Sequence, residues 1–95
     1  MKINLKFIVV LGAPEAFGET EFAFELEGSS AGDLIRELMG KYGAKSERVF
    51  LTHGHYETNL QIIVNWRKYV PPERMDEFLL REGDTIIFTH LVEGG

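Results

Sequence analysis

The sequence contains no cysteine. This absence excludes disulfide bridges, thiolate-bound zinc, cysteine-ligated iron–sulfur clusters and a cysteine nucleophile. Whatever chemistry the chain takes part in therefore does not use a thiol of its own.

Basic residues are also scarce, with ten lysines and arginines against fifteen acidic residues and a formal net charge of −5. A surface of this sign does not favour phosphate backbones, so we expect no direct nucleic-acid partner. The longest strongly apolar run, Phe7–Leu11, is far shorter than the roughly 20 residues of a membrane-spanning helix, and the start has no signal-peptide pattern. We therefore expect no membrane partner and a cytoplasmic location.

Nucleotide-binding motifs of the G-x-x-x-x-G-K-[ST] or G-x-G-x-x-G kind are missing as well. His53 and His55 offer two imidazoles without a third ligand spaced to join them, which disfavours a metal site. His90 follows the last predicted strand, where we expect its imidazole to meet solvent. The sequence thus predicts that this chain binds no cofactor and no metal.

What the sequence does have is the pattern of a single folded domain over residues 1–95, with 44% hydrophobic residues. Alternation over Lys2–Leu11 predicts a strand whose inner face carries the odd-numbered residues, including Val9 and Leu11. Alternation over Thr20–Glu27 predicts a second strand. Glycines and a proline between the two predict a turn, and hence a β-hairpin.

Ser30 and Asp33 have the spacing of a capping box, which predicts a helix that begins there and ends at Gly43. Residues 44–58 indicate no more than a short helix or turn followed by a loop. Further strands are predicted at 60–64, 69–70 and 85–89, with a polar helical turn over 73–80 anchored by Met75, Phe78 and Leu79. This order predicts an α+β fold of the β-grasp (ubiquitin-like) type, a roll in which one main helix packs on a mixed sheet of four to five strands.

Four stretches together resemble one protein family: the amino-terminal hairpin, "SSAGDLIREL", "IIVNW" and "LREGDTIIFTHLVEGG". They are similar to the MoaD/ThiS-like ubiquitin-like sulfur carriers, above all to the small (sulfur carrier) subunit of molybdopterin synthase. The similarity spans nearly the whole chain, and the ending in Gly-Gly is its most specific part. Trp66 stands where members of the family usually have glycine, and His90 and Leu91 replace their proline-rich approach to the glycines.

The resemblance implies a function for the last two residues. Without a Cβ, Gly94 and Gly95 form a flexible tail that can thread a narrow channel and bring its carboxylate into a partner's active site. The resemblance implies that an E1-like enzyme uses ATP to adenylate Gly95 and that sulfur then makes it a thiocarboxylate. The sulfur would be donated to molybdopterin, for the molybdenum cofactor, on the large subunit of molybdopterin synthase. The chain itself would be a carrier rather than an enzyme, supplying position to catalytic partners.

A partner surface is predicted on the outer face of the sheet, where Ile8, Val10, Ile63 and Ile87 fall on nominally outward positions of three strands. A bulge or a covering loop would bury some of these side chains instead. Other functions remain open at this point: a ubiquitin-like protein modifier, a sulfur carrier for transfer RNA, or a non-covalent β-grasp interaction module. The sequence does not fix the final acceptor, the oligomeric state or the role of residues 44–58.

Overall fold

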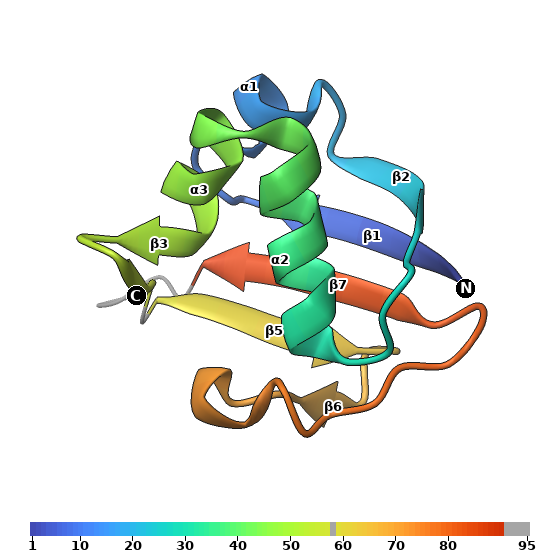
Figure 1. The fold of residues 1–95 in the computed structure, drawn as a ribbon. Coiled ribbons are helices and arrows are strands. Elements are labelled where there is room, and N and C mark those ends of the chain that lie inside the picture. The colour runs from blue at the N-terminus through green and yellow to red at the C-terminus, as the bar shows by residue number, and fades with distance from the viewer. Residues whose placement is uncertain (58, 91–95) are drawn as a thin grey trace.

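The computed structural model describes residues 1–57 and 59–90 (Figure 1). Its elements, in chain order, are β1 (Lys2–Ile8), α1 (Ala13–Phe17), β2 (Glu21–Glu25), α2 (Ala31–Tyr42), α3 (Ala44–Phe50), β3 (Leu51–Thr52), β4 (His55–Tyr56), β5 (Leu60–Val64), β6 (Lys68–Tyr69), the 3-10 turn η1 (Pro72–Arg74) and β7 (Thr85–His90).

Five strands form one mixed sheet in the order β2-β1-β7-β5-β6, and β3 pairs with β4 in a separate hairpin. β1 and β7 are parallel at the centre, whereas the other neighbouring pairs of the large sheet are antiparallel. In this register Leu5 lies opposite Ile86, and Ile63 lies opposite Ile87. The first and last strands are therefore neighbours, and the last strand is flanked on both sides.

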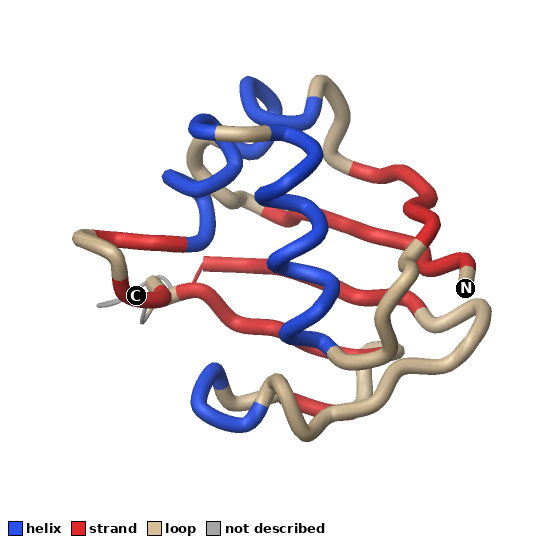
Figure 2. The backbone as a smooth tube through the Cα atoms, viewed as in Figure 1, coloured by secondary structure: helices blue, strands red, loops and turns tan. Residues whose placement is uncertain are grey.

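The helix α2 packs across one face of this sheet, so the domain has two layers (Figures 1 and 2). Its buried stripe consists of Leu34, Ile35 and Leu38, which join Leu5 and Phe88 of the sheet in the core. The apolar face of α2 packs on the apolar face of the sheet. Both faces are removed from water, and this burial stabilises the pairing of the two layers. The predicted β-grasp fold is confirmed.

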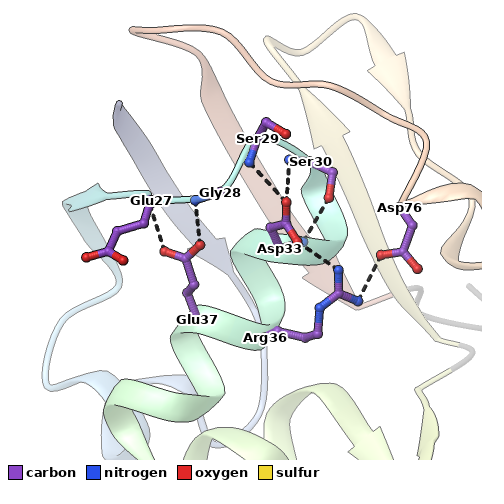
Figure 3. Close-up of polar contacts among 8 residues, drawn as sticks. All are labelled: Glu27, Gly28, Ser29, Ser30, Asp33, Arg36, Glu37 and Asp76. Carbon is purple, nitrogen blue, oxygen red and sulfur yellow. Dashed lines mark hydrogen bonds and ion pairs between the residues drawn. The ribbon is translucent and has the colours of Figure 1, made fainter.

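The start of α2 is fixed by the predicted capping box (Figure 3). The Ser30 Oγ accepts a hydrogen bond from the backbone N–H of Asp33 at 3.0 Å. In return, the Asp33 carboxylate accepts from the N–H groups of Ser29 at 3.0 Å and of Ser30 at 3.2 Å. These bonds satisfy amides that a helix start leaves without partners. They lower the pKa of Asp33 well below its usual range, the N–H of Ser29 most and the guanidinium of Arg36 next.

Two more side chains tie α2 to its surroundings (Figure 3). Glu37 accepts from the backbone N–H groups of Glu27 at 2.8 Å and of Gly28 at 2.7 Å, which holds the segment that leaves β2. Arg36 bridges Asp33 at 2.9 Å and Asp76 at 2.8 Å. The helix is thereby fixed to segments on both of its sides.

The end of the core beside α1 is closed by aromatic rings. Phe7 stacks on Phe17 of α1 with a centroid distance of 4.7 Å and on Phe88 of β7 at 4.8 Å. The segment that we predicted as a turn is thus the helix α1, with Pro14 in its first turn and Gly12 and Gly18 at its ends. Proline is favourable there because its missing N–H would have no intrahelical partner.

The prediction that Leu79 anchors the segment after η1 is wrong, because its side chain is 68% exposed. Its backbone forms an isolated bridge with Ser30, and the adjacent Leu80 is buried in its place. Met75 is buried as predicted, and Phe78 packs against the core. Within residues 1–57 and 59–90, none of the helices has the length and apolar character needed to cross a bilayer.

Candidate functional site

The candidate site is the end of the sheet at which the central strand β7 finishes. The register places Ile8 of β1 opposite Thr89 and Leu60 of β5 opposite His90, so β7 is hydrogen-bonded on both sides up to its end. The predicted functional residues Gly94 and Gly95 follow this strand and lie outside the described residues. An extended chain spans at most about 3.5 Å per residue, so the five residues after His90 reach no farther than about 18 Å from it.

His90 is attached to the loop that follows β1. The backbone N–H of Leu11 donates to its Nδ1 at 3.5 Å. The Nε2 atom is buried and has no hydrogen-bond partner in the part of the chain that the structure describes. The expectation that this imidazole meets solvent is therefore wrong for Nε2.

A second ionisable side chain, the carboxylate of Glu57, lies at the same end of the sheet. The pKa of Glu57 is lowered from its ordinary value, chiefly by the hydrogen bond from the Thr52 hydroxyl, then by the backbone N–H of Asn59, and to a smaller extent by the charge of His90. Glu57 comes from the segment between β4 and β5. The β3–β4 hairpin is thus linked by side-chain hydrogen bonds to the start of β5, beside the end of β7.

Two of the four residues predicted for the partner surface are not exposed. Ile87 is fully buried, because it lies on the central strand with Lys6 opposite it on one side and Ile63 on the other. Long side chains on both neighbouring strands cover a central position even on an open face. Ile8 is 38% exposed, and Ile63 is half-buried.

Val10 is buried for a different reason. β1 ends at Ile8, and Val9 adopts a φ of +53°, in the left-handed region that β-branched residues rarely occupy. The strand alternation therefore stops, Val10 turns into the core, and Val9 and Leu11 are 73% and 80% exposed. The prediction that Val9 and Leu11 face inward is also wrong. The sequence signal for this reversal of inward and outward positions is Gly12 with Pro14, which favours an early end to the strand.

At its opposite end, β7 begins just after a turn over residues 81–84, in which the N–H of Asp84 donates to the carbonyl of Arg81 at 3.0 Å. The Asp84 carboxylate accepts from the Asn65 Nδ2 at 3.0 Å and from the backbone N–H of Arg81 at 2.8 Å. The Asn65 Oδ1 in turn accepts from the N–H of Thr85 at 2.8 Å. The turn after β5 and the turn before β7 are thus joined, which fixes where β7 starts.

Asn65 and Trp66 form the β5–β6 turn with φ values of 54° and 58°. The N–H of Arg67 donates to the carbonyl of Val64 at 3.0 Å, and two central residues with positive φ define a type I′ turn. A tryptophan resists this conformation, and here it adopts it with its indole 59% exposed. The neighbouring hydrogen bonds of Asn65 hold the turn in place.

Within residues 1–57 and 59–90, His90 makes no hydrogen bond to Thr52 or Glu57, so these side chains are not linked as a nucleophile, base and acid. Among the described residues, no group of three or more histidine, aspartate or glutamate side chains is placed to hold a metal ion. What the geometry provides is a rigid strand that leads to the last residues of the chain, with an exposed apolar loop beside it.

Comparisons with known proteins agree with this description of the fold. No family model matches the sequence, and no curated protein does. Solved structures do match over nearly the full length. A small archaeal modifier protein 1 (SAMP1) from Methanosarcina acetivorans aligns with a TM-score of 0.71 at 24% identity, covering 99% of this chain and 96% of its own.

Two other solved structures extend the comparison. A putative molybdopterin converting factor, subunit 1, from Pyrococcus furiosus has a TM-score of 0.69 at 25% identity, covering 97% of this chain and 99% of that one. A chain of the Amycolatopsis orientalis BexX/CysO complex has a TM-score of 0.71 at 18% identity, with 98% and 99% covered. The structural neighbours are thus small ubiquitin-like proteins of the MoaD/ThiS type that the sequence resembles, and the chain has their β-grasp fold.

Proposed function

We propose that this protein is a ubiquitin-like sulfur carrier whose terminal glycine, Gly95, is adenylated and converted to a thiocarboxylate, and that it donates this sulfur in molybdopterin biosynthesis. The observation that carries the proposal is the path of the chain: a strand fixed on both sides runs directly into a sequence that ends in Gly-Gly. The Pyrococcus furiosus neighbour, named as a molybdopterin converting factor subunit, supports the molybdopterin assignment.

The chemistry needs activation because a carboxylate is a poor electrophile. The Gly95 carboxylate oxygen attacks the α-phosphorus of ATP, pyrophosphate leaves, and a mixed anhydride with AMP forms. Hydrosulfide released by a sulfur donor then attacks the glycine carbonyl carbon, and AMP leaves with the former carboxylate oxygen, so that one oxygen is exchanged for sulfur. ATP is used by the activating enzyme, and this chain contributes a tethered reacting group of high effective concentration.

The partners are an E1-like adenylating enzyme and the large subunit of molybdopterin synthase. The Amycolatopsis orientalis neighbour is a complex of CysO with BexX, which supports a fold used in assemblies with other proteins. The partner surface keeps two of the four predicted residues, Ile8 and Ile63, on the face of the sheet away from α2. Ile63→Asp should weaken both complexes while the domain stays folded; unfolding would assign Ile63 to the core.

The terminal chemistry is tested by intact-mass measurement after incubation with the adenylating enzyme, ATP and a sulfur donor. We expect the mass change of one oxygen replaced by sulfur, located at the C-terminus by fragmentation. Deletion of Gly94 and Gly95 should abolish the change and leave the unfolding transition intact. An unchanged mass with an enzyme that charges another carrier would contradict the proposal.

A second function is a ubiquitin-like modifier, in which the activated glycine is joined to a lysine amine. The similarity to a small archaeal modifier protein favours it as the alternative. A sulfur carrier for transfer RNA would share the activation step, and a non-covalent module would not need it. Denaturing electrophoresis of a cell extract separates the first of these, because isopeptide conjugates persist as higher-mass species and a thiocarboxylate does not produce them.

A further inference from the structure

Three apolar side chains in and just after the end of β1 are exposed together. Ile8 is 38% exposed, Val9 73% and Leu11 80%. We call these three residues the apolar loop. Three large apolar side chains exposed within four positions of the chain indicate an interaction surface, whereas apolar side chains exposed singly need no such explanation.

The apolar loop is held in place rather than left free. Val10, between its exposed members, is buried, and its carbonyl accepts from the N–H of Ala13 at 3.2 Å. The N–H of Leu11 donates to His90. Val9 is kept at a positive φ that disfavours a β-branched side chain. A strained backbone that the surrounding structure maintains is a reason to look for a function at that position.

The location of the apolar loop limits what can touch it. Parallel pairing places Ile8 opposite Thr89, so the loop begins where β7 ends. The five residues after His90 span at most about 18 Å. An enzyme that takes Gly95 into its active site must therefore come within about 18 Å of His90, which is hydrogen-bonded to Leu11 of the loop.

Charged residues border the apolar loop on one side. Gly12, Glu15, Lys45 and Arg48 line a pocket between α1 and α3, immediately beyond Leu11. An apolar centre with a rim of both charge signs is the usual composition of a protein–protein interface. The charges argue against a lipid surface as the occupant, because Glu15 would face its headgroups alongside the two cations.

We propose that the apolar loop docks on an apolar surface of the adenylating enzyme, beside the entrance through which the enzyme receives Gly95. This inference rests on the proposed function and identifies the surface by which that enzyme selects its carrier. Docking there fixes the start of the tail relative to the active site, so fewer conformations of the tail are searched before reaction.

The test uses the full chain and the E1-like adenylating enzyme purified from the same organism, with ATP, and follows pyrophosphate release. Leu11→Asp should raise the KM for the carrier by about tenfold or more, because burial of a leucine is lost and a charge is placed in the interface. Leu79→Asp is the matched control. Leu79 is 68% exposed and lines a pocket with Asn65 and Asp84 at the other end of β7, so its KM should stay unchanged.

A second variant separates docking from folding. Val9→Asn should raise the thermal midpoint by about 4 to 8 °C, since asparagine tolerates a positive φ better than valine does. It should also raise the KM, since it removes an apolar contact. A purely structural role for Val9 predicts the same stabilisation with an unchanged KM, and that result would overturn the proposal.

The failures can be told apart. If the wild-type chain releases no pyrophosphate with the enzyme, the proposed function fails. If the wild-type chain is activated and Leu11→Asp has the KM of Leu79→Asp, the function stands and docking by the loop is refuted. If sedimentation shows a wild-type dimer that Leu11→Asp dissociates with no change in KM, the loop belongs to a contact between two copies and the proposal is overturned.

Discussion

Asn65 and Asp84 lie nineteen positions apart in the sequence and are joined side chain to side chain by a hydrogen bond of 3.0 Å. The Asn65 Oδ1 also accepts from the backbone N–H of Thr85, next to Asp84. The Asp84 carboxylate also accepts from the backbone N–H of Arg81, in its own turn. The type I′ turn after β5 is therefore held by the turn that starts β7. This connection allows the β5–β6 turn to include Trp66, a residue type that disfavours the positive φ found there.

The first prediction concerns that residue. Trp66→Gly should stabilise the fold by about 1 kcal/mol, because glycine adopts the positive φ of 58° without the penalty of a side chain and this gain exceeds its entropic cost. Urea unfolding measures the difference. Arg67, whose φ is not positive, is the control: Arg67→Gly should leave stability unchanged or lower it. Equal stabilisation by both variants would contradict the prediction.

A pair of glycines should respond to alanine in opposite ways. A Cβ on Gly28 would lie 2.6 Å from the Asp33 Cβ, so Gly28→Ala should disturb the capping box and cost about 1 to 3 kcal/mol. A Cβ on Gly40, in α2, would meet nothing within 4 Å, so Gly40→Ala should stabilise the helix by about 0.5 to 1 kcal/mol. Thermal unfolding compares both with the wild type. Stabilisation by Gly28→Ala would show that packing at Gly28 is not limiting, and destabilisation by Gly40→Ala would contradict the expected gain in the helix.

Val10 and Leu11 provide a test of the corrected strand end. Val10→Ala removes buried side-chain atoms and should cost roughly 2 kcal/mol, whereas Leu11→Ala, at an 80% exposed position, should stay within about 0.5 kcal/mol of the wild type. Chemical denaturation measures both. A larger loss for Leu11→Ala would mean that unbroken alternation, with Leu11 inward, describes the protein in solution.

Asp33 makes stability depend on acid. Its pKa is lowered in the folded state, so the carboxylate stabilises the fold fully above its ordinary pKa of 3.8 and progressively less as the pH falls toward the folded-state pKa. We expect the free energy of unfolding of the wild type to drop more steeply than that of Asp33→Asn between about pH 5 and pH 2.

The comparison isolates this carboxylate, because all other acidic groups are present in both proteins. Urea titrations at a series of pH values give the two curves. Their difference should be constant above about pH 5 and shrink below it. Parallel curves throughout would show that the hydrogen bonds from Ser29 and Ser30 do not favour the charged form.

Much of this fold could be predicted from local signals. The capping box at Ser30 and Asp33 is read from four residues, and β5 and the core part of β1 come from clean alternation. These features depend on residues that are close together in the sequence, so residue types at fixed spacings predict them. The helix α1 could not be seen, because five residues between two glycines and containing a proline are also typical of a turn.

The candidate site was less predictable because it depends on long-range pairing. Alternation assigns Ile87 correctly to the outer face, yet its burial follows from the neighbours Lys6 and Ile63, which come from distant strands. The exposed apolar loop follows from the backbone angle at Val9, and Gly12 with Pro14 indicates an early end to the strand without fixing the residue at which it occurs. Gly94 and Gly95 remain predictions from the sequence, outside the described residues.

The parallel pairing of β1 with β7 has a mechanical consequence. A pull on the C-terminus against the N-terminus loads the bonds between these strands in shear, so that they resist together instead of opening one after another. The antiparallel partner β5 adds a second row on the other side of β7. A partner that pulls on the end of this chain should therefore have to break the pairings of β7 with β1 and β5 together, so the domain stays folded under such a load.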